Sequence, residues 1–160
     1  MVLTGLLFAL AIVLSVIENS LPPIPVPVPG VKLGLSNIAV MYALFFLGKS
    51  RAFMIAILKA AFVFMIKGGI AGLLSLSGGL ASLAVMLLLM FLFQDKISYL
   101  ILSVSGAVFH NAGQFTAVSF VFTNIFLWPY LPVLLLAGII AGIFTSVLLK
   151  SIMPALNRLN

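Results

Sequence analysis

The sequence predicts an all-α integral membrane protein, a bundle of about six transmembrane helices that forms one domain over residues 1–160. The first observation is composition, because 64% of the residues are hydrophobic and only 6% are charged. A soluble domain is usually about 25% charged, so this chain could not cover its surface with water-compatible side chains. The second observation is length, since about 20 residues per span leave room for about five to seven helices. The third is the spacing of prolines, glycines and charges, which divide the apolar sequence into segments of that size.

The first apolar segment, residues 2–21, is interpreted as a membrane span and not as a secretion signal. It has no Lys or Arg in its first turn, the apolar run is too long, and no small-x-small cleavage site precedes the prolines. The next segment, residues 22–30, reads PPIPVPVPG. Because proline fixes its own φ and disfavours helix in the preceding residue, an extended, polyproline-like strap is expected there.

The remaining spans follow from the punctuation of the sequence. Five further helices are expected at residues 33–48, 52–74, 80–93, 97–122 and 133–153, with Pro154 closing the last. The connections expected between them are a basic turn at 49–51, a flexible SLSGG turn at 75–79, a polar turn at 94–96 and an interfacial segment at 124–132. That last segment contains Trp128 and Tyr130, residue types that favour the headgroup zone of a bilayer.

The distribution of basic residues predicts the orientation in the cell membrane, because short cytoplasmic loops are enriched in Lys and Arg. One side of the predicted bundle carries Lys49, Arg51, Lys96, Lys150 and Arg158, and the other carries Lys32. Both termini are therefore expected in the cytoplasm. The proline strap, the SLSGG turn and the segment that contains Trp128 are expected at the outer face.

Polar residues inside the predicted spans indicate a binding site, because polar groups are costly in a membrane and usually face the bundle interior. Counted from the cytoplasmic ends at the rise of a helix, Glu18 and Lys67 lie about 24 Å along their spans, and His110 about 20 Å. Asn37 lies about 6 Å below the outer start of the second span. The same slab contains Asn19, Lys32, Asn111 and Gln114. Together these residues predict a polar pocket open to the outer face beneath the strap.

Each polar residue also has a purely structural interpretation. Glu18 and Lys67 could form an ion pair or extend to the outer interface, and Lys32 suits a solvated interfacial charge. Lys59 lies near mid-membrane and could line a helix contact or a partner surface. His110 alone would suit a hydrogen-bonded core histidine.

Two short polar runs nevertheless favour a functional interpretation. Residues 110–114 (HNAGQ) hold more polar groups than a structural span needs, and His110 and Gln114 share a helix face. The run KLGLSN, residues 32–37, could begin a helix with exposed backbone amides, a geometry that suits an anion.

Small residues recur four positions apart on three of the predicted spans. The pairs are Gly5 and Ala9, Gly68 and Gly72, and Gly138 and Gly142. Such pairs let two helices approach closely. They fit packing within the bundle as well as contact with a partner protein.

Several chemistries have no residues to support them, and we expect neither enzyme activity nor catalytic residues. The chain has two acidic residues, Glu18 and Asp95, which fall far apart in the predicted topology, so paired acid–base catalysis is not expected. With no Cys and one His it lacks the usual zinc spacings, and it has no GxxxxGK[ST] phosphate loop. It also lacks the Asp-rich motifs that hold magnesium in prenyl-diphosphate synthesis. No metal, cofactor or nucleic-acid partner is therefore expected.

Two stretches carry a resemblance to a known family. Residues 29–48, PGVKLGLSNIAVMYALFFLG, and residues 106–114, GAVFHNAGQ, resemble the bacterial family called Gx transporters, also labelled heptaprenyl diphosphate synthase component I. That family is similar to the substrate-binding S components of energy-coupling-factor vitamin transporters. The resemblance implies a six-helix S-component-like fold with a site near the outer face, capped by the loop after the first helix.

The resemblance also implies partners. S components dock to a shared transmembrane coupling subunit that works with two ATPases. Small residues on the first helix carry much of that docking, usually as AxxxA, and the nearest match here is Gly5 with Ala9.

These observations predict the substrate-binding component of an uptake transporter for a small, anionic or vitamin-like solute. Lys32, Lys67 and the amides near Asn37 would hold an anionic group, with Asn19 beside them, and Glu18 would balance charge or bind an amine. His110, Asn111 and Gln114 would supply directional hydrogen bonds. The alternatives are a membrane accessory subunit of isoprenoid metabolism that binds a prenyl diphosphate, and a structural subunit with no ligand. The identity of the solute, the energy source and the oligomeric state stay open.

Overall fold

The computed structural model describes residues 2–20, 36–122 and 125–156, and these fold into helices with no strand among them. The α-helices are α1 (Val2–Ser20), α2 (Asn37–Tyr42), α3 (Lys49–Lys67), α4 (Gly69–Phe93), α5 (Tyr99–Phe122) and α6 (Leu131–Leu156). Three shorter helices connect them, a π-helix η1 (Ala43–Leu47) and two 3-10 helices, η2 (Gln94–Lys96) and η3 (Ile125–Tyr130). The all-helical prediction is confirmed for this part of the chain.

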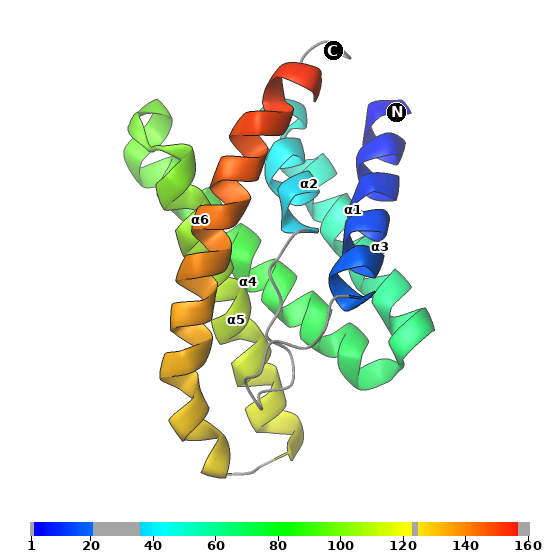
Figure 1. Ribbon diagram of the computed structural model, residues 1–160, viewed down its shortest axis with the longest axis vertical. Coiled ribbons are helices and arrows are strands. Elements are labelled where there is room, and N and C mark those ends of the chain that lie inside the picture. The colour runs from blue at the N-terminus through cyan, green and yellow to red at the C-terminus, as the bar shows by residue number, and fades with distance from the viewer. Residues whose placement is uncertain (1, 21–35, 123–124, 157–160) are drawn as a thin grey trace.

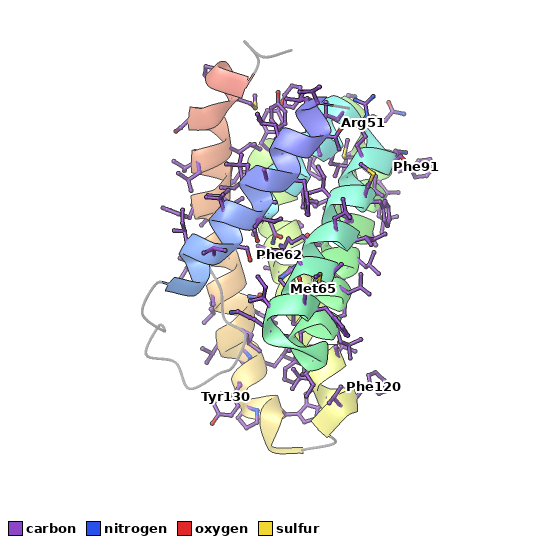
Figure 2. The ribbon with its side chains drawn as sticks, turned by 90° about the vertical axis from the view of Figure 1, so that its right-hand side faces the viewer. Arg51, Phe62, Met65, Phe91, Phe120 and Tyr130 are labelled. Carbon is purple, nitrogen blue, oxygen red and sulfur yellow. The ribbon has the colours of Figure 1, made fainter. Side chains whose placement is uncertain are left out.

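The helices pack in an order that places α2 inside the bundle and α4 between α3 and α5. α5 packs against α6, and α1 packs against α3. α2 contacts α1, α3 and α6, so it joins the two outer helices (Figure 1). α1 begins and α6 ends at the same end of the bundle (Figure 1). The opposite end holds η3, with Tyr130 and Phe120 far from Arg51 (Figure 2).

The segment from Asn37 to Leu47 is largely enclosed by its neighbours. Its residues from Ile38 to Leu44 are all buried, the pattern of a helix that is surrounded on every side. Tyr42 is fully buried and stacks on Phe46 at 4.6 Å between ring centroids. The hydrophobic core forms around this segment, with Leu7 of α1, Ile55 of α3, Leu83 of α4, Leu102 of α5 and Leu149 of α6.

Within residues 2–20, 36–122 and 125–156, two helices are long and apolar enough to cross a membrane, Gly69–Phe93 and Trp128–Ser151. Val2–Ile17 and Asn37–Leu47 are shorter apolar helices. α3 is less hydropathic because it carries four basic residues, Lys49, Arg51, Lys59 and Lys67. α5 is a continuous helix, but the polar run that contains His110 and Gln114 interrupts its apolar sequence.

The predicted turn at residues 75–79 is wrong, since these residues lie within α4. The chain reverses instead at Gly68, a single residue with φ +88° and ψ 176°. This region of backbone space is available essentially to glycine alone. Ser and Gly do not break α4 because an apolar environment offers the backbone no water with which to exchange its hydrogen bonds.

Other boundaries also differ from the sequence expectation. The basic residues 49–51 form the first turn of α3, and the turn before them is Gly48, with φ +99°. Pro154 lies inside the last turn of α6 and does not end it. The polar turn at 94–96 is confirmed as η2. The predicted strap at 22–30 lies outside the described residues.

Candidate functional site

A buried cation lies at the centre of the bundle. Lys59 is near the middle of α3 and only 7% exposed. Its ammonium group donates a hydrogen bond of 2.9 Å to Oδ1 of Asn37, the first residue of α2. A buried charge is tolerated only where polar groups compensate for lost water. The start of α2 is therefore fixed at mid-bundle by a charge-assisted hydrogen bond.

A small, partly open cavity of about 10 Å³ adjoins this pair. Its lining residues come from α2, α3 and α4: Asn37, Val40, Ala56, Lys59, Ser75, Gly79, Ser82 and Met86. Ser75 and Ser82 are both buried. The cavity is thus polar on the side of Lys59, Asn37 and the two serines, and apolar elsewhere.

The serines lie on a face of α4 that is made of small residues. Ser75 and Ser82 are seven positions apart, so they share one face of the helix about two turns apart. Gly78 and Gly79 occupy the turn between them. Because these side chains are small, they leave the space into which Lys59 extends. They also let α5 approach the same turn of α4 from the side opposite Lys59.

The α5 residues His110 and Gln114 lie against that same turn of α4. Both are buried, and their Nε2 atoms are 3.2 Å apart. A Cβ atom added to Gly78 would lie 2.8 Å from Cγ of Gln114 and 2.9 Å from Cε1 of His110. Because Gly78 and Gly79 are adjacent, the α5 pair and the cavity flank one turn of α4.

Asn111 points in a different direction from its neighbour His110. Its Nδ2 donates a 2.9 Å hydrogen bond to the backbone oxygen of Leu134, on α6. Consecutive helical residues are rotated by about 100°, so one of them reaches α4 and the other reaches α6. The structure therefore separates two residues that the sequence had placed in a single site, and the bond of Asn111 ties α5 to α6.

The remaining predicted site residues lie away from this centre or outside the described residues. Lys67 is the last residue of α3 and is exposed. Lys32 lies outside the described residues, and so do the side chains of Glu18 and Asn19 in the last turn of α1.

Asn37 is deeper in the bundle than predicted. Its bond to Lys59 sets it level with the middle of α3, and not about 6 Å from the outer end. The described part of the second helix begins only at Asn37, which explains the difference.

Three residues of this centre were absent from the predicted site, namely Lys59, Ser75 and Ser82. Lys59 carried a signal, since a lysine near the middle of an apolar segment is costly unless it faces a polar interior. The serines carried no such signal, because they belonged to a predicted turn or to an unremarkable helix position. Among the described residues no group of three or more His, Cys, Asp or Glu could hold a metal ion.

The small-residue pairs divide into packed and exposed ones. A Cβ atom on Gly142 would lie 2.5 Å from Cα of Val104, so α6 packs directly on α5 there. Gly5 and Ala9 are exposed on α1, and a Cβ atom on Gly5 would meet nothing within 4 Å. The α6 pair is therefore an internal helix contact, whereas the α1 pair is available at the surface.

The comparison with known families adds an independent finding. The sequence model of the family described as heptaprenyl diphosphate synthase component I matches residues 7–152. The chain belongs to this family. The match extends over all six helices, so the buried centre and the exposed α1 face both lie within the heptaprenyl diphosphate synthase component I region. No curated protein and no solved structure matches the chain.

Proposed function

We propose that this protein is the membrane-embedded, substrate-binding component of an uptake system for a small organic anion. The observation that carries the proposal is the buried cluster of Lys59, Asn37, Ser75 and Ser82, flanked by His110 and Gln114, at the centre of an apolar bundle. Convergent polar groups inside a membrane bundle usually mark a ligand or ion pathway. Lys59 supplies the positive charge, and the amide, imidazole and hydroxyl groups supply directional hydrogen bonds.

The apolar exterior supports membrane insertion of the whole bundle. Large hydrophobic side chains are exposed on every long helix, among them Met65 at 83%, Phe91 at 77% and Phe120 at 80%. Figure 2 shows such side chains along the outside of the bundle. A soluble protein rarely exposes continuous apolar surface of this extent. In the proposed arrangement all six helices lie in the bilayer, with both termini and Arg51 at the cytoplasmic face.

The partner in this proposal is an energy-coupling transmembrane subunit with its ATPases. The family description names a component, which fits a protein that works with other subunits. The exposed α1 face containing Gly5 and Ala9 would allow another helix to approach closely. The chain itself is proposed to be a binding protein and not an enzyme, because its two carboxylates cannot supply a magnesium site for prenyl transfer.

A second candidate function has its own supporting observation. An apolar groove of about 610 Å³ lies between α3 and α4, lined by Ile57, Ala60, Ala61, Phe64, Met65, Gly69, Gly72, Leu73 and Leu76. The exposed Lys67 is the last residue of α3, and in the sequence it falls between the lining residues Met65 and Gly69. A hydrocarbon groove beside a cation suits a prenyl diphosphate. Together with the family description, it supports an accessory subunit of isoprenoid metabolism as the alternative.

Native mass spectrometry of the gently purified protein, with identification of any released molecule, tests these functions. We expect a water-soluble anion that is bound by the wild type and lost in Lys59→Met and His110→Ala, both of which should still fold. Lys150→Ala, which changes an exposed cation on α6, is the matched control.

The other outcomes separate the alternatives. A co-purifying prenyl diphosphate or other lipid would favour the accessory subunit. Wild-type solute binding in both variants would contradict the assignment of Lys59 and His110 to the site. A protein that carries no ligand and loses stability without partners would contradict both proposals and indicate a structural subunit.

A further inference from the structure

We propose that a groove at one end of α5 binds a hydrocarbon chain of a membrane phospholipid. The groove has a volume of about 410 Å³ and is lined by residues of α5, by Trp128 of η3 and by Leu131 of α6. It shares no lining residue with the cavity beside Lys59. The inference goes beyond the proposed uptake function and rests on one part of it, the insertion of the bundle in a bilayer.

The groove follows one face of α5. The residues that α5 contributes have the spacing of a single helix face: Ala112, Phe115, Thr116, Ser119 and Phe120. His110, which lies against α4, is on another side of the helix, because Ala112 follows it by about 200° of rotation. From Ala112 to Phe120 the face extends about 12 Å along the helix axis. α5 therefore presents a polar pair to α4 and an apolar groove on a different side.

This face is continuous with the bilayer-facing surface of the proposed bundle. Phe109, Phe120 and Trp128 are all exposed. Figure 2 shows Phe120 at the end of the bundle opposite Arg51, which is also the end that holds η3. Because Trp favours the headgroup zone, Trp128 is expected at the mouth of the groove and Ala112 deeper in the hydrocarbon region.

The lining offers a ligand few polar groups. Thr116 Oγ1 donates a 2.9 Å hydrogen bond to the backbone oxygen of Ala112, and Ser119 Oγ donates a 2.9 Å hydrogen bond to that of Phe115. Both hydroxyl protons are therefore used within α5. The described lining contains no charged residue. A charged or strongly polar ligand would lose its water here without compensation, whereas a hydrocarbon chain has no such cost.

A lipid chain is the occupant that fits these conditions. In a bilayer the medium against this surface is hydrocarbon, and a hollow left unfilled would deprive its lining of van der Waals contacts. Phe115 is buried, and its ring meets that of Trp128 edge-on with centroids 5.6 Å apart, so the two rings make one aromatic wall. Trp128 also carries an indole N–H, a donor that suits the ester carbonyl at the head of an acyl chain.

Trp128 is the single tryptophan of the chain, so its fluorescence reports on this groove alone. Bromine atoms on a lipid chain quench indole fluorescence only at close range. The probe is dibrominated phosphatidylcholine, titrated into the purified full-length protein in dodecyl maltoside. We expect quenching that saturates once each protein holds a single lipid. Quenching that rises in proportion to the lipid-to-detergent ratio, without saturation, would indicate nonspecific contact and overturn the proposal.

Ala112→Phe should block the groove, because the added ring would occupy its deep end. We expect this variant to lose the saturable phase while its helix content, measured by circular dichroism, stays that of the wild type. Val121→Phe places the same ring at an exposed position of α5 outside the lining, and should be quenched as the wild type is. An unchanged saturable phase in Ala112→Phe would also overturn the proposal. Ala112→Leu makes the same test with a smaller side chain if the Phe variant does not fold.

Dibrominated phosphatidylglycerol separates recognition of the chain from recognition of a charged headgroup. Because the described lining carries no charge, the two lipids should give the same saturation curve. Saturation with the anionic lipid alone would overturn the proposal. The readout involves neither a solute nor Lys59 and His110, so failure of this lipid site and failure of the uptake function are distinguishable. Insertion of the bundle is tested separately, by cysteine labelling in cells.

Discussion

At the scale of single residues, the chemistry of this protein is concentrated in Lys59 and the groups around it. Its ammonium and the Asn37 amide join α3 to α2 by a bond between positions 22 residues apart. Removing the acceptor of such a pair lowers stability more than replacing the charged side chain with an apolar one of similar shape. Loss of the acceptor leaves the charge itself buried. Substitutions in this pair should therefore change the free energy of unfolding in a way that substitution of a surface lysine does not.

This asymmetry gives a prediction for the folded state. Asn37→Ala should lower the free energy of unfolding by about 1.5–3 kcal/mol, since the buried ammonium loses the hydrogen bond to the Asn37 side chain. Lys59→Met should lower it less, because it removes the buried charge itself and leaves only a neutral, half-buried amide without this donor. Unfolding titrations in mixed micelles would measure both, and a larger loss in Lys59→Met than in Asn37→Ala would contradict this account.

His110 and Asn111 are adjacent in the sequence, but their side chains point to different helices. His110 is directed to Gly78 on α4 and pairs with Gln114, whereas Asn111 is hydrogen-bonded to α6. We therefore assign Asn111 to the packing of α5 against α6. The ligand-contacting role proposed for α5 belongs to His110 and Gln114.

At the scale of elements, glycines set where helices turn and where they touch. Gly48 and Gly68 are one-residue turns with positive φ, and each lets two helices follow one another directly. Gly142 acts differently, since it brings α6 against Val104 on α5. The bond from Ser103 Oγ to the Gly142 backbone oxygen, 2.7 Å long, lies at the same contact.

The close contact at Gly142 predicts the effect of a single methyl group. Gly142→Ala should destabilise the protein by about 1–3 kcal/mol, because the new Cβ atom would overlap the backbone of α5 and force the helices apart. Gly5→Ala is the control, since its Cβ atom would meet nothing within 4 Å on α1. Thermal melting of both variants in the same detergent would measure the difference, and equal melting temperatures would disprove the contact.

At the scale of the whole molecule, the two ends of the bundle differ in composition. The end where α1 begins carries Arg51, and the opposite end carries Tyr130 and Phe120 (Figure 2). Basic residues favour the cytoplasmic side, whereas Tyr is enriched at both interfaces, so the basic residues decide the orientation. The proposed topology follows from this difference, with residues 49–51 and 94–96 inside and η3 outside.

Cysteine labelling tests this topology, because the natural chain has no cysteine. Ser50→Cys and Ser98→Cys should react with a membrane-impermeant maleimide only after the cells are opened, whereas Pro129→Cys should react in intact cells. All three positions are exposed, which keeps the reagent access comparable. Labelling of Ser50→Cys in intact cells would reverse the proposed orientation, and labelling of all three would argue against insertion of the bundle.

The sequence by itself determined the helical class, the first helix, the polar turn at 94–96 and the shared helix face of His110 and Gln114. These depend on composition and on local spacing, which the chain carries wherever it folds. The tertiary structure decided that Ser75–Gly79 continue a helix, that Gly68 is the turn, and that Asn37 meets Lys59 at mid-bundle. Such features depend on which helices pack together, because Gly and Ser weaken a helix in water but form close contact points inside an apolar bundle.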